Sequence, residues 1–157
     1  MNNENISMKM QIKELERHEI PLLISLIEEM AEFEKLRSEL SLKAEILEEQ
    51  IFDRERAKAA LILLEGIVAG YCIYFYNFSS FMGRSGLYIE DIYLKPAYRG
   101  KGYGKQVFDF LEAKAGDEGC ARMEWACLNW NRKAIDFYER NGAVPMKEWI
   151  IYRKKLI

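Results

Sequence analysis

The 157-residue chain has little of several residue types, with one histidine, three cysteines and three prolines. A single histidine, His18, excludes nearly all Ser-His and Cys-His nucleophilic chemistry, and lone histidines mostly serve structure. The cysteines Cys72, Cys120 and Cys127 have no C-x-x-C spacing, which indicates reduced thiols rather than a disulfide frame or a metal site. Since no histidine lies near it, Cys127 is expected to be a buried thiol and not a nucleophile.

Long apolar runs and a strong charge of one sign are also missing. No apolar stretch approaches the roughly 20 residues of a membrane span, and the polar start MNNENISMKM has no apolar core of a secretory signal. The formal net charge of −2 argues against a chain built to coat nucleic acid. We therefore expect a cytoplasmic protein that binds neither membrane nor nucleic acid.

The composition is that of a globular protein, since 50% of the residues are hydrophobic and 31% are charged. The length predicts one domain over residues 1–157 with a substantial core, and a frayed segment at 1–7. Hydrophobic spacing predicts the elements in order. They are a strand at 8–15, helices at 18–35 and after the N-cap Ser41, a hairpin at 57–78 around Glu65-Gly66, a strand at 86–94, a helix at 103–116, a strand at 122–128, a helix at 131–140 and a strand at 148–154.

This order predicts a mixed α/β (α+β) layer with a central sheet, and a small α+β sandwich without a ligand cleft is the alternative fold. A glycine-rich stretch, YLKPAYRGKGYGK at 93–105, lies at a strand-to-helix junction. Backbone N–H groups at a helix start attract anions such as phosphate, and glycines let the backbone approach them closely. The P-loop and dinucleotide patterns do not match, whereas R-x-x-G-x-G fits Arg99, Gly102 and Gly104. A flexible basic turn is the structural alternative.

The segments LYIEDIYLKPAYRGKGYGK and NWNRKAIDFYERNGA together resemble the GNAT family of N-acetyltransferases. Within it, the chain is similar to the branch of diamine (spermidine/spermine) and thialysine acetyltransferases and their bacterial relatives. The resemblance implies a mixed central sheet flanked by about four helices. It also implies acetyl-CoA as cosubstrate, a homodimer, and transfer of an acetyl group to a small primary amine by direct attack in a ternary complex.

The resemblance also assigns roles to residues. Glu90 attracts the ammonium of the acceptor and relays its proton, as general base, and Tyr138 is the general acid that protonates the leaving thiolate. Asp91 points to the opposite face from Glu90 if the strand is regular. The expected contacts of acetyl-CoA are the backbone of Ile92, Tyr93 and Leu94 for pantetheine, the loop of Arg99, Gly100, Lys101, Gly102, Tyr103, Gly104 and Lys105 for pyrophosphate, and Asn131, Lys133 and Tyr138.

On the acceptor side the chain departs from the polyamine enzymes. Where these carry an Asp-Pro-Trp feature, the chain has FSSFMGRSG, which removes an acid and adds Arg84. This change disfavours spermine and favours a small amine with an amino-acid head, whose carboxylate Arg84 would pair. The expected acceptor contacts are Phe33, Glu34, Phe81, Arg84, Glu90, Glu124, Trp125, Ala126 and Glu148.

Three other functions fit parts of the sequence. The chain would acetylate a protein lysine or N-terminus if the crowded loop admits a peptide. It would be a CoA-binding sensor if it binds CoA without turnover, although the presence of both Glu90 and Tyr138 argues for catalysis. RNA binding through Tyr98 and Tyr103 is weaker, since four cations in one loop suit a single pyrophosphate better than a polymer.

Overall fold

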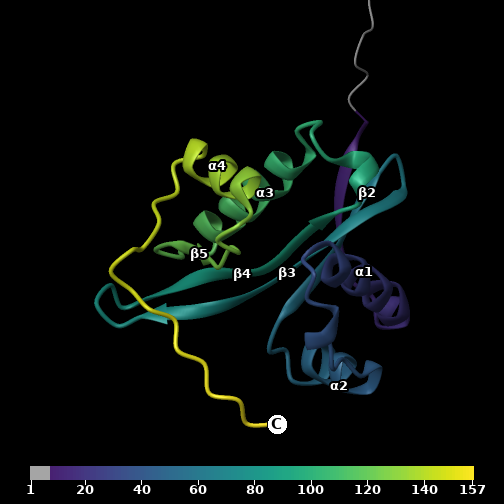
Figure 1. The fold of residues 1–157 in the computed structure, drawn as a ribbon, viewed down its shortest axis with the longest axis horizontal. Coiled ribbons are helices and arrows are strands. Elements are labelled where there is room, and N and C mark those ends of the chain that lie inside the picture. The colour runs from purple at the N-terminus through teal and green to yellow at the C-terminus, as the bar shows by residue number, and fades with distance from the viewer. Residues whose placement is uncertain (1–7) are drawn as a thin grey trace, which may run out of the picture. The chain divides into compact units, whose positions relative to one another are not determined.

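The computed structural model describes residues 8–157, and the segment 1–7 that we expected to be frayed lies outside them (Figure 1). The chain forms two compact units, of which the first ends at Trp125 and the second is Ala126–Ile157. One domain over the whole chain stays a prediction.

The first unit contains one mixed sheet of five strands, which confirms the expected fold class. The strands lie in chain order and are β1 (Met10–Glu14), β2 (Lys58–Leu64), β3 (Ile67–Ser79), β4 (Arg84–Leu94) and β5 (Met123–Trp125). The pairs from β1 to β4 are antiparallel, and β5 is parallel to β4. A parallel neighbour requires a crossover connection, which here is the helix α3 (Tyr103–Asp117).

Helices cover both faces of this sheet, as Figure 1 shows. On one face lie α1 (Ile20–Phe33) and α2 (Ala44–Glu48), which continues as one π-helical turn, η3 (Glu49–Asp53). Short 3₁₀ turns are η1 (Arg17–Glu19), η2 (Arg37–Glu39) and η4 (Pro96–Tyr98). The helix of the second unit is α4 (Arg132–Arg140). In residues 8–157, no helix has the length and apolar character to cross a bilayer.

The main core lies between α1 and the sheet. Leu23 and Leu26 of α1 are fully buried against Tyr71 and Ile73 of β3 and Tyr93 of β4. Burial of each such side chain contributes about 1.5–3 kcal/mol. Since the side chains of a strand alternate in direction, these residues mark the sheet face that α1 covers, and the alternate residues face α3.

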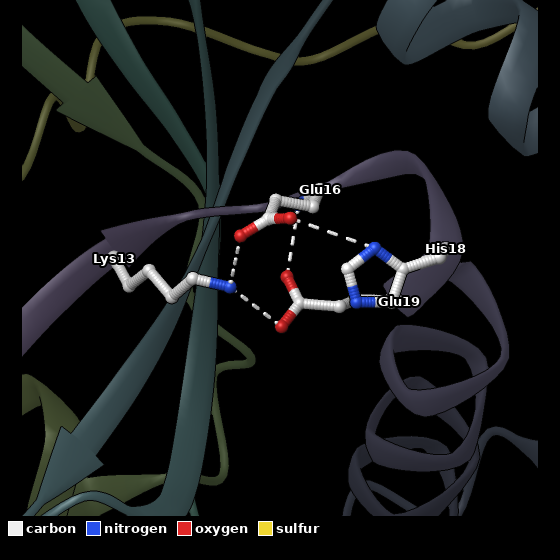
Figure 2. A network of polar contacts seen from close by, with 4 residues as sticks. All are labelled: Lys13, Glu16, His18 and Glu19. Atoms are coloured by element: carbon white, nitrogen blue, oxygen red, sulfur yellow. Dashed lines mark hydrogen bonds and ion pairs between the residues drawn. The ribbon is translucent and has the colours of Figure 1, made fainter.

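The turn η1, which leads directly into α1, is held by charged side chains that Figure 2 shows. The Glu16 N–H donates to the Glu19 carboxylate at 2.9 Å, and Lys13 forms ion pairs with both carboxylates at 2.7 Å. His18 Nδ1 lies 3.5 Å from the Glu16 carboxylate, and its side chain is largely exposed. His18 therefore belongs to the surface network at this helix start.

Three local predictions are wrong. Ser41 does not cap α2, because the chain stays extended through Lys43 and the helix begins at Ala44. Residues 148–154 form no strand, although Trp149 and Ile151 are exposed apolar residues at alternate positions. The alternating pattern favours a strand only where a sheet edge pairs with it, and residues 126–157 provide none. Cys127 is exposed rather than buried, because β5 ends two residues earlier.

Candidate active site

One irregularity in β4 organises the candidate site. Ile73 of β3 pairs with Asp91, but the next residue of β3, Tyr74, pairs with Ile89. Glu90 is therefore an extra residue in β4 without a partner in β3, which is a β-bulge. The strand is therefore not regular at this point, so the condition under which Glu90 and Asp91 were expected to face opposite ways is not met.

The bulge decides which face the two carboxylates use. Residues paired across strands share a face, and Ile73 belongs to the core under α1, so Asp91 also lies on the α1 face. Tyr74 lies on the other face, where the Lys114 ammonium of α3 is 5.9 Å from its ring centre. Glu90 stands outside the ladder with an exposed side chain beside Asp91.

Asp91 has an unusual environment for a carboxylate. The Tyr71 hydroxyl donates a hydrogen bond to Asp91 Oδ2 at 3.1 Å. Burial raises the pKa of Asp91 to about 7, and the negative charges of Glu90 and Glu34 add to this, while the Tyr71 hydrogen bond opposes it. Burial alone raises the pKa of Glu34, which is half-buried at the end of α1. These groups titrate closer to neutral pH than ordinary carboxylates do.

In residues 8–157, these carboxylates form no ion pair with a lysine or an arginine. Among the described residues, neither Glu34, Glu90 nor Asp91 has a lysine or arginine nitrogen within ion-pair distance. Three neighbouring carboxylates without a cation favour a positively charged guest such as an ammonium group. The described residues also contain no cluster of three His, Cys, Asp or Glu placed to hold a metal ion.

The next part of β4 offers its backbone on one side. The ladder between β4 and β5 has three residue pairs and ends at Ile89 and Trp125. From Glu90 to Leu94, β4 continues beside β3 alone. Except for the Leu94 carbonyl, which accepts from Arg99, backbone groups on the β5 side of this stretch are therefore available to an extended guest chain.

The glycine loop has the backbone geometry that we expected of an anion site. Gly100 and Gly102 have φ values of +73° and +84°, which side chains disfavour. Gly102 precedes α3, and no side chain caps this helix. The N–H groups of its first turn therefore lack an internal partner and point toward the loop. Gly104 has room around it, since a Cβ would meet only a Leu94 methyl at 3.9 Å.

The cations of the loop contact protein groups in this structure. Arg99 Nε donates to the Leu94 carbonyl at 2.7 Å, and its guanidinium lies 4.1 Å from the Phe33 ring centre. Lys101 donates to the Ala97 carbonyl at 2.9 Å, and Lys105 pairs with Asp109 at 2.7 Å. Their contact with a pyrophosphate stays a prediction, and the uncapped backbone N–H groups are the donors that the loop itself presents.

The expected acceptor residues do not all gather at one place. Phe33 and Glu34 end α1 near the carboxylates, whereas Phe81 and Arg84 lie at the tip of the β3–β4 hairpin. Arg84 is six strand residues from Glu90, about 20 Å along β4. A lysine-sized acceptor in one subunit cannot contact both.

Two residues of β5, Glu124 and Trp125, contact other side chains of the protein. Asn77 donates to the Glu124 carboxylate at 2.7 Å, and Arg122 lies 3.1 Å from it. Trp125 packs edge-to-face against Phe108 of α3, with ring centres 5.2 Å apart. Substrate contact by either stays a prediction.

In the second unit, the structure confirms Asn131 as the N-cap of α4, where its side chain accepts from the Ala134 N–H at 3.3 Å. Tyr138 lies on α4 with its ring against Phe137, and Lys133 on the same helix is exposed. Glu148 lies outside any helix or strand, and Ala126 is exposed. Their roles stay predictions.

Sequence reasoning missed Tyr71 as a functional residue and set Asp91 aside. In the sequence, Tyr71 is one of many apolar residues in a buried strand. A fully buried tyrosine needs a hydrogen-bond partner for its hydroxyl, and this need is the one feature that points to Tyr71. The adjacent acids Glu90 and Asp91 were visible, but the face of each depends on the register with β3.

Comparison with known proteins finds both sequence relatives and similar structures. The family model described as Acetyltransferase (GNAT) family matches residues 23–143. A thialysine N-epsilon-acetyltransferase of Bos taurus is 32% identical over 154 residues, which cover 90% of this chain and 90% of that enzyme. An L-ornithine N5-acetyltransferase of Arabidopsis thaliana is 42% identical over 87 residues, which are 55% of this chain and 38% of that enzyme. An integron cassette protein of V. cholerae matches the fold with a TM-score of 0.76 at 23% identity, over 94% of this chain and 93% of that one.

Proposed function

We propose, from the premise that the chain belongs to the acetyltransferase (GNAT) family, that it acetylates a small primary amine by direct attack in a ternary complex. The family establishes an acetyltransferase, and the acceptor and the mechanism are the proposal. The observation that carries it is the group of carboxylates Glu34, Glu90 and Asp91 near the open stretch of β4, which have no lysine or arginine partner among residues 8–157.

The residues present fit acetyl-CoA as the donor. The uncapped start of α3 and the two glycines with positive φ suit its pyrophosphate, and the unpaired side of Ile92–Leu94 suits its pantetheine arm. When bound, acetyl-CoA supplies the thioester that the amine attacks. A backbone N–H of this stretch polarises the carbonyl, and Asn131 and Lys133 complete the expected contacts.

The acceptor enters as an ammonium ion, because an alkyl amine has a pKa near 10. Glu90, the exposed carboxylate, attracts it and starts the removal of its proton. The neutral amine then attacks the carbonyl, and Tyr138 protonates the thiolate that leaves. The assignment of Tyr138 rests on the sequence resemblance.

The relatives named for thialysine and ornithine favour an amino acid with a primary amine at the end of its side chain. A diamine or polyamine has the same reacting group and is the wider class. We further propose a homodimer in the cytoplasm. Phe81 and Arg84 fit the acceptor role only if the second subunit contributes them, because Arg84 lies about 20 Å from Glu90 along β4 and Phe81 lies in the turn beyond it.

The test is release of free CoA thiol from acetyl-CoA with a panel of thialysine, ornithine, lysine, putrescine, spermidine, spermine and a lysine peptide. We expect the highest kcat/KM with one of the small amino acids, a large loss in Glu90→Gln and a slower reaction in Tyr138→Phe. Turnover of the peptide alone would assign protein acetylation. Tight CoA binding without turnover of any amine would refute the proposal and favour a sensor.

A further inference from the structure

The hydroxyl of Tyr71 lies between two hydrogen-bond acceptors. It is 3.1 Å from Asp91 Oδ2 and 3.3 Å from Met30 Sδ. A phenol has one proton to donate, whereas an ionised carboxylate and a thioether sulfur can only accept. Tyr71 is fully buried, so water does not reach its hydroxyl, whereas Asp91 and Met30 are partly exposed.

The arrangement therefore has two hydrogen-bonded states that differ by one proton. When Asp91 is ionised, Tyr71 donates to it, and the Met30 sulfur is left without a donor, which is a small loss for a weak acceptor. When Asp91 is protonated, its O–H donates to the Tyr71 oxygen, and the Tyr71 O–H turns to Met30 Sδ. Every donor then has an acceptor, so a proton on Asp91 is accommodated without an unpaired polar group.

We propose that Asp91 accepts the proton of the acceptor amine and that Tyr71 positions it, whereas Glu90 attracts the ammonium from solvent. This inference rests on the proposed function of the site. It divides between two neighbouring carboxylates the tasks that the sequence assigned to Glu90 alone.

The proton balance is complete. The ammonium R–NH₃⁺ transfers one proton to the Asp91 carboxylate, which leaves R–NH₂ and a neutral carboxylic acid. The amine forms the C–N bond as the C–S bond breaks, its second proton passes to the thiolate, and CoA leaves as a thiol. Asp91 then loses its proton to solvent, so each cycle releases one H⁺.

The surroundings of the two carboxylates suit this division. The titratable groups that face Asp91 are Tyr71 of β3, Glu90 of β4 and Glu34 at the end of α1. Burial and the two neighbouring acids raise the pKa of Asp91 to about 7, which is the range in which a base accepts and releases a proton readily at neutral pH. Glu90 is exposed, which suits the capture of a hydrated ammonium.

The test is the pH dependence of kcat/KM, which reports ionisation of the free enzyme, for the best amine of the panel. We expect an acidic limb near pH 7 in the wild type. In Asp91→Asn this limb is lost and kcat falls about 100-fold, the usual scale for a general base. In Tyr71→Phe the limb moves to higher pH, because the hydrogen bond that lowers the pKa of Asp91 is gone. In Glu90→Gln the amine KM rises more than kcat falls.

Tyr74→Phe is the matched control, because Tyr74 is also a buried tyrosine of β3 but faces α3. It is expected to leave the limb in place, so a shift in Tyr71→Phe alone is not a general effect of a lost hydroxyl. A ¹³C NMR titration of the aspartate carboxyls, with the Asp91 signal identified by its absence in Asp91→Asn, reads the same ionisation without turnover. An active wild type whose limb persists in Asp91→Asn would overturn this inference alone, whereas a wild type inactive on every amine would refute the proposed function with it.

Discussion

Arg99 connects the glycine loop to β4 and to the end of α1. The free energy of unfolding that is lost when its side chain is removed can be calculated from these contacts. Its Nε donates to the Leu94 carbonyl at 2.7 Å, and its guanidinium lies 4.1 Å from the ring centre of Phe33 and 5.3 Å from that of Tyr93. A hydrogen bond from a charged donor contributes about 1.5–3 kcal/mol. A cation over an exposed ring adds about 0.5–1 kcal/mol.

We therefore predict that Arg99→Met lowers the free energy of unfolding by about 2–3 kcal/mol. Methionine keeps much of the length and apolar surface of arginine, so the loss comes from the charge and the donors. Urea unfolding at one pH measures it. Arg56→Met is the matched control, since Arg56 is exposed and forms no ion pair within residues 8–157, and its effect should stay within about 0.5 kcal/mol.

A double-mutant cycle with Phe33→Leu separates the ring contact from the hydrogen bond. The coupling between the two positions should be about 0.5–1 kcal/mol, and the remaining loss belongs to Leu94 and Tyr93. If Arg99→Met unfolds at the same urea concentration as Arg56→Met, the reasoning is refuted, and Arg99 is free for a ligand instead.

Three further predictions follow from single positions. Gly102→Ala should destabilise the protein by about 1–2 kcal/mol because residue 102 has a positive φ. Gly104→Ala, inside α3, should instead stabilise it by about 0.5–1 kcal/mol. Equal shifts of the two variants in thermal melting would contradict the loop geometry. Asn131→Ala should lose about 1 kcal/mol of helix stability and speed hydrogen exchange at the start of α4, with Asn131→Asp as the control that keeps the cap. Asp91 has a folded pKa of about 7, above its unfolded value, so its favourable contribution is complete below about pH 4 and is lost as the pH rises through 7. Asp91→Asn should therefore gain stability relative to the wild type as the pH rises from about 4 to 7, with a total gain of about 4 kcal/mol that stays constant above this range, and a difference in urea unfolding that does not change over this range would contradict the raised pKa.

The element order was predictable because apolar spacing reports directly on burial. The residues of α1 recur at helical intervals and are buried on one side, and the run around Glu65-Gly66 forms the expected hairpin. The glycine loop was also predictable, since Gly100 and Gly102 have the positive φ values that only glycine adopts easily.

What failed depends on contacts between distant segments. The final strand at 148–154 has the right alternation, but a strand exists only where another strand pairs with it. Likewise, the sequence EDI gives no sign that β3 skips Glu90, because the register follows from the packing of Ile73 and Tyr74 on opposite faces. The role of Asp91 was hidden for that reason.

The bulge also has a consequence for variation. Ile89 and Asp91 pair with consecutive residues of β3. The pairing between β3 and β4 on both sides of the bulge would therefore be the same if residue 90 were deleted. The fold therefore places almost no demand on the side chain at this position, which is exposed and unpaired. A library of all amino acids at position 90 should yield folded proteins throughout, and differences among its members would measure chemistry with little interference from stability. Substitutions at this position can therefore change the preferred acceptor without lowering the stability of the fold.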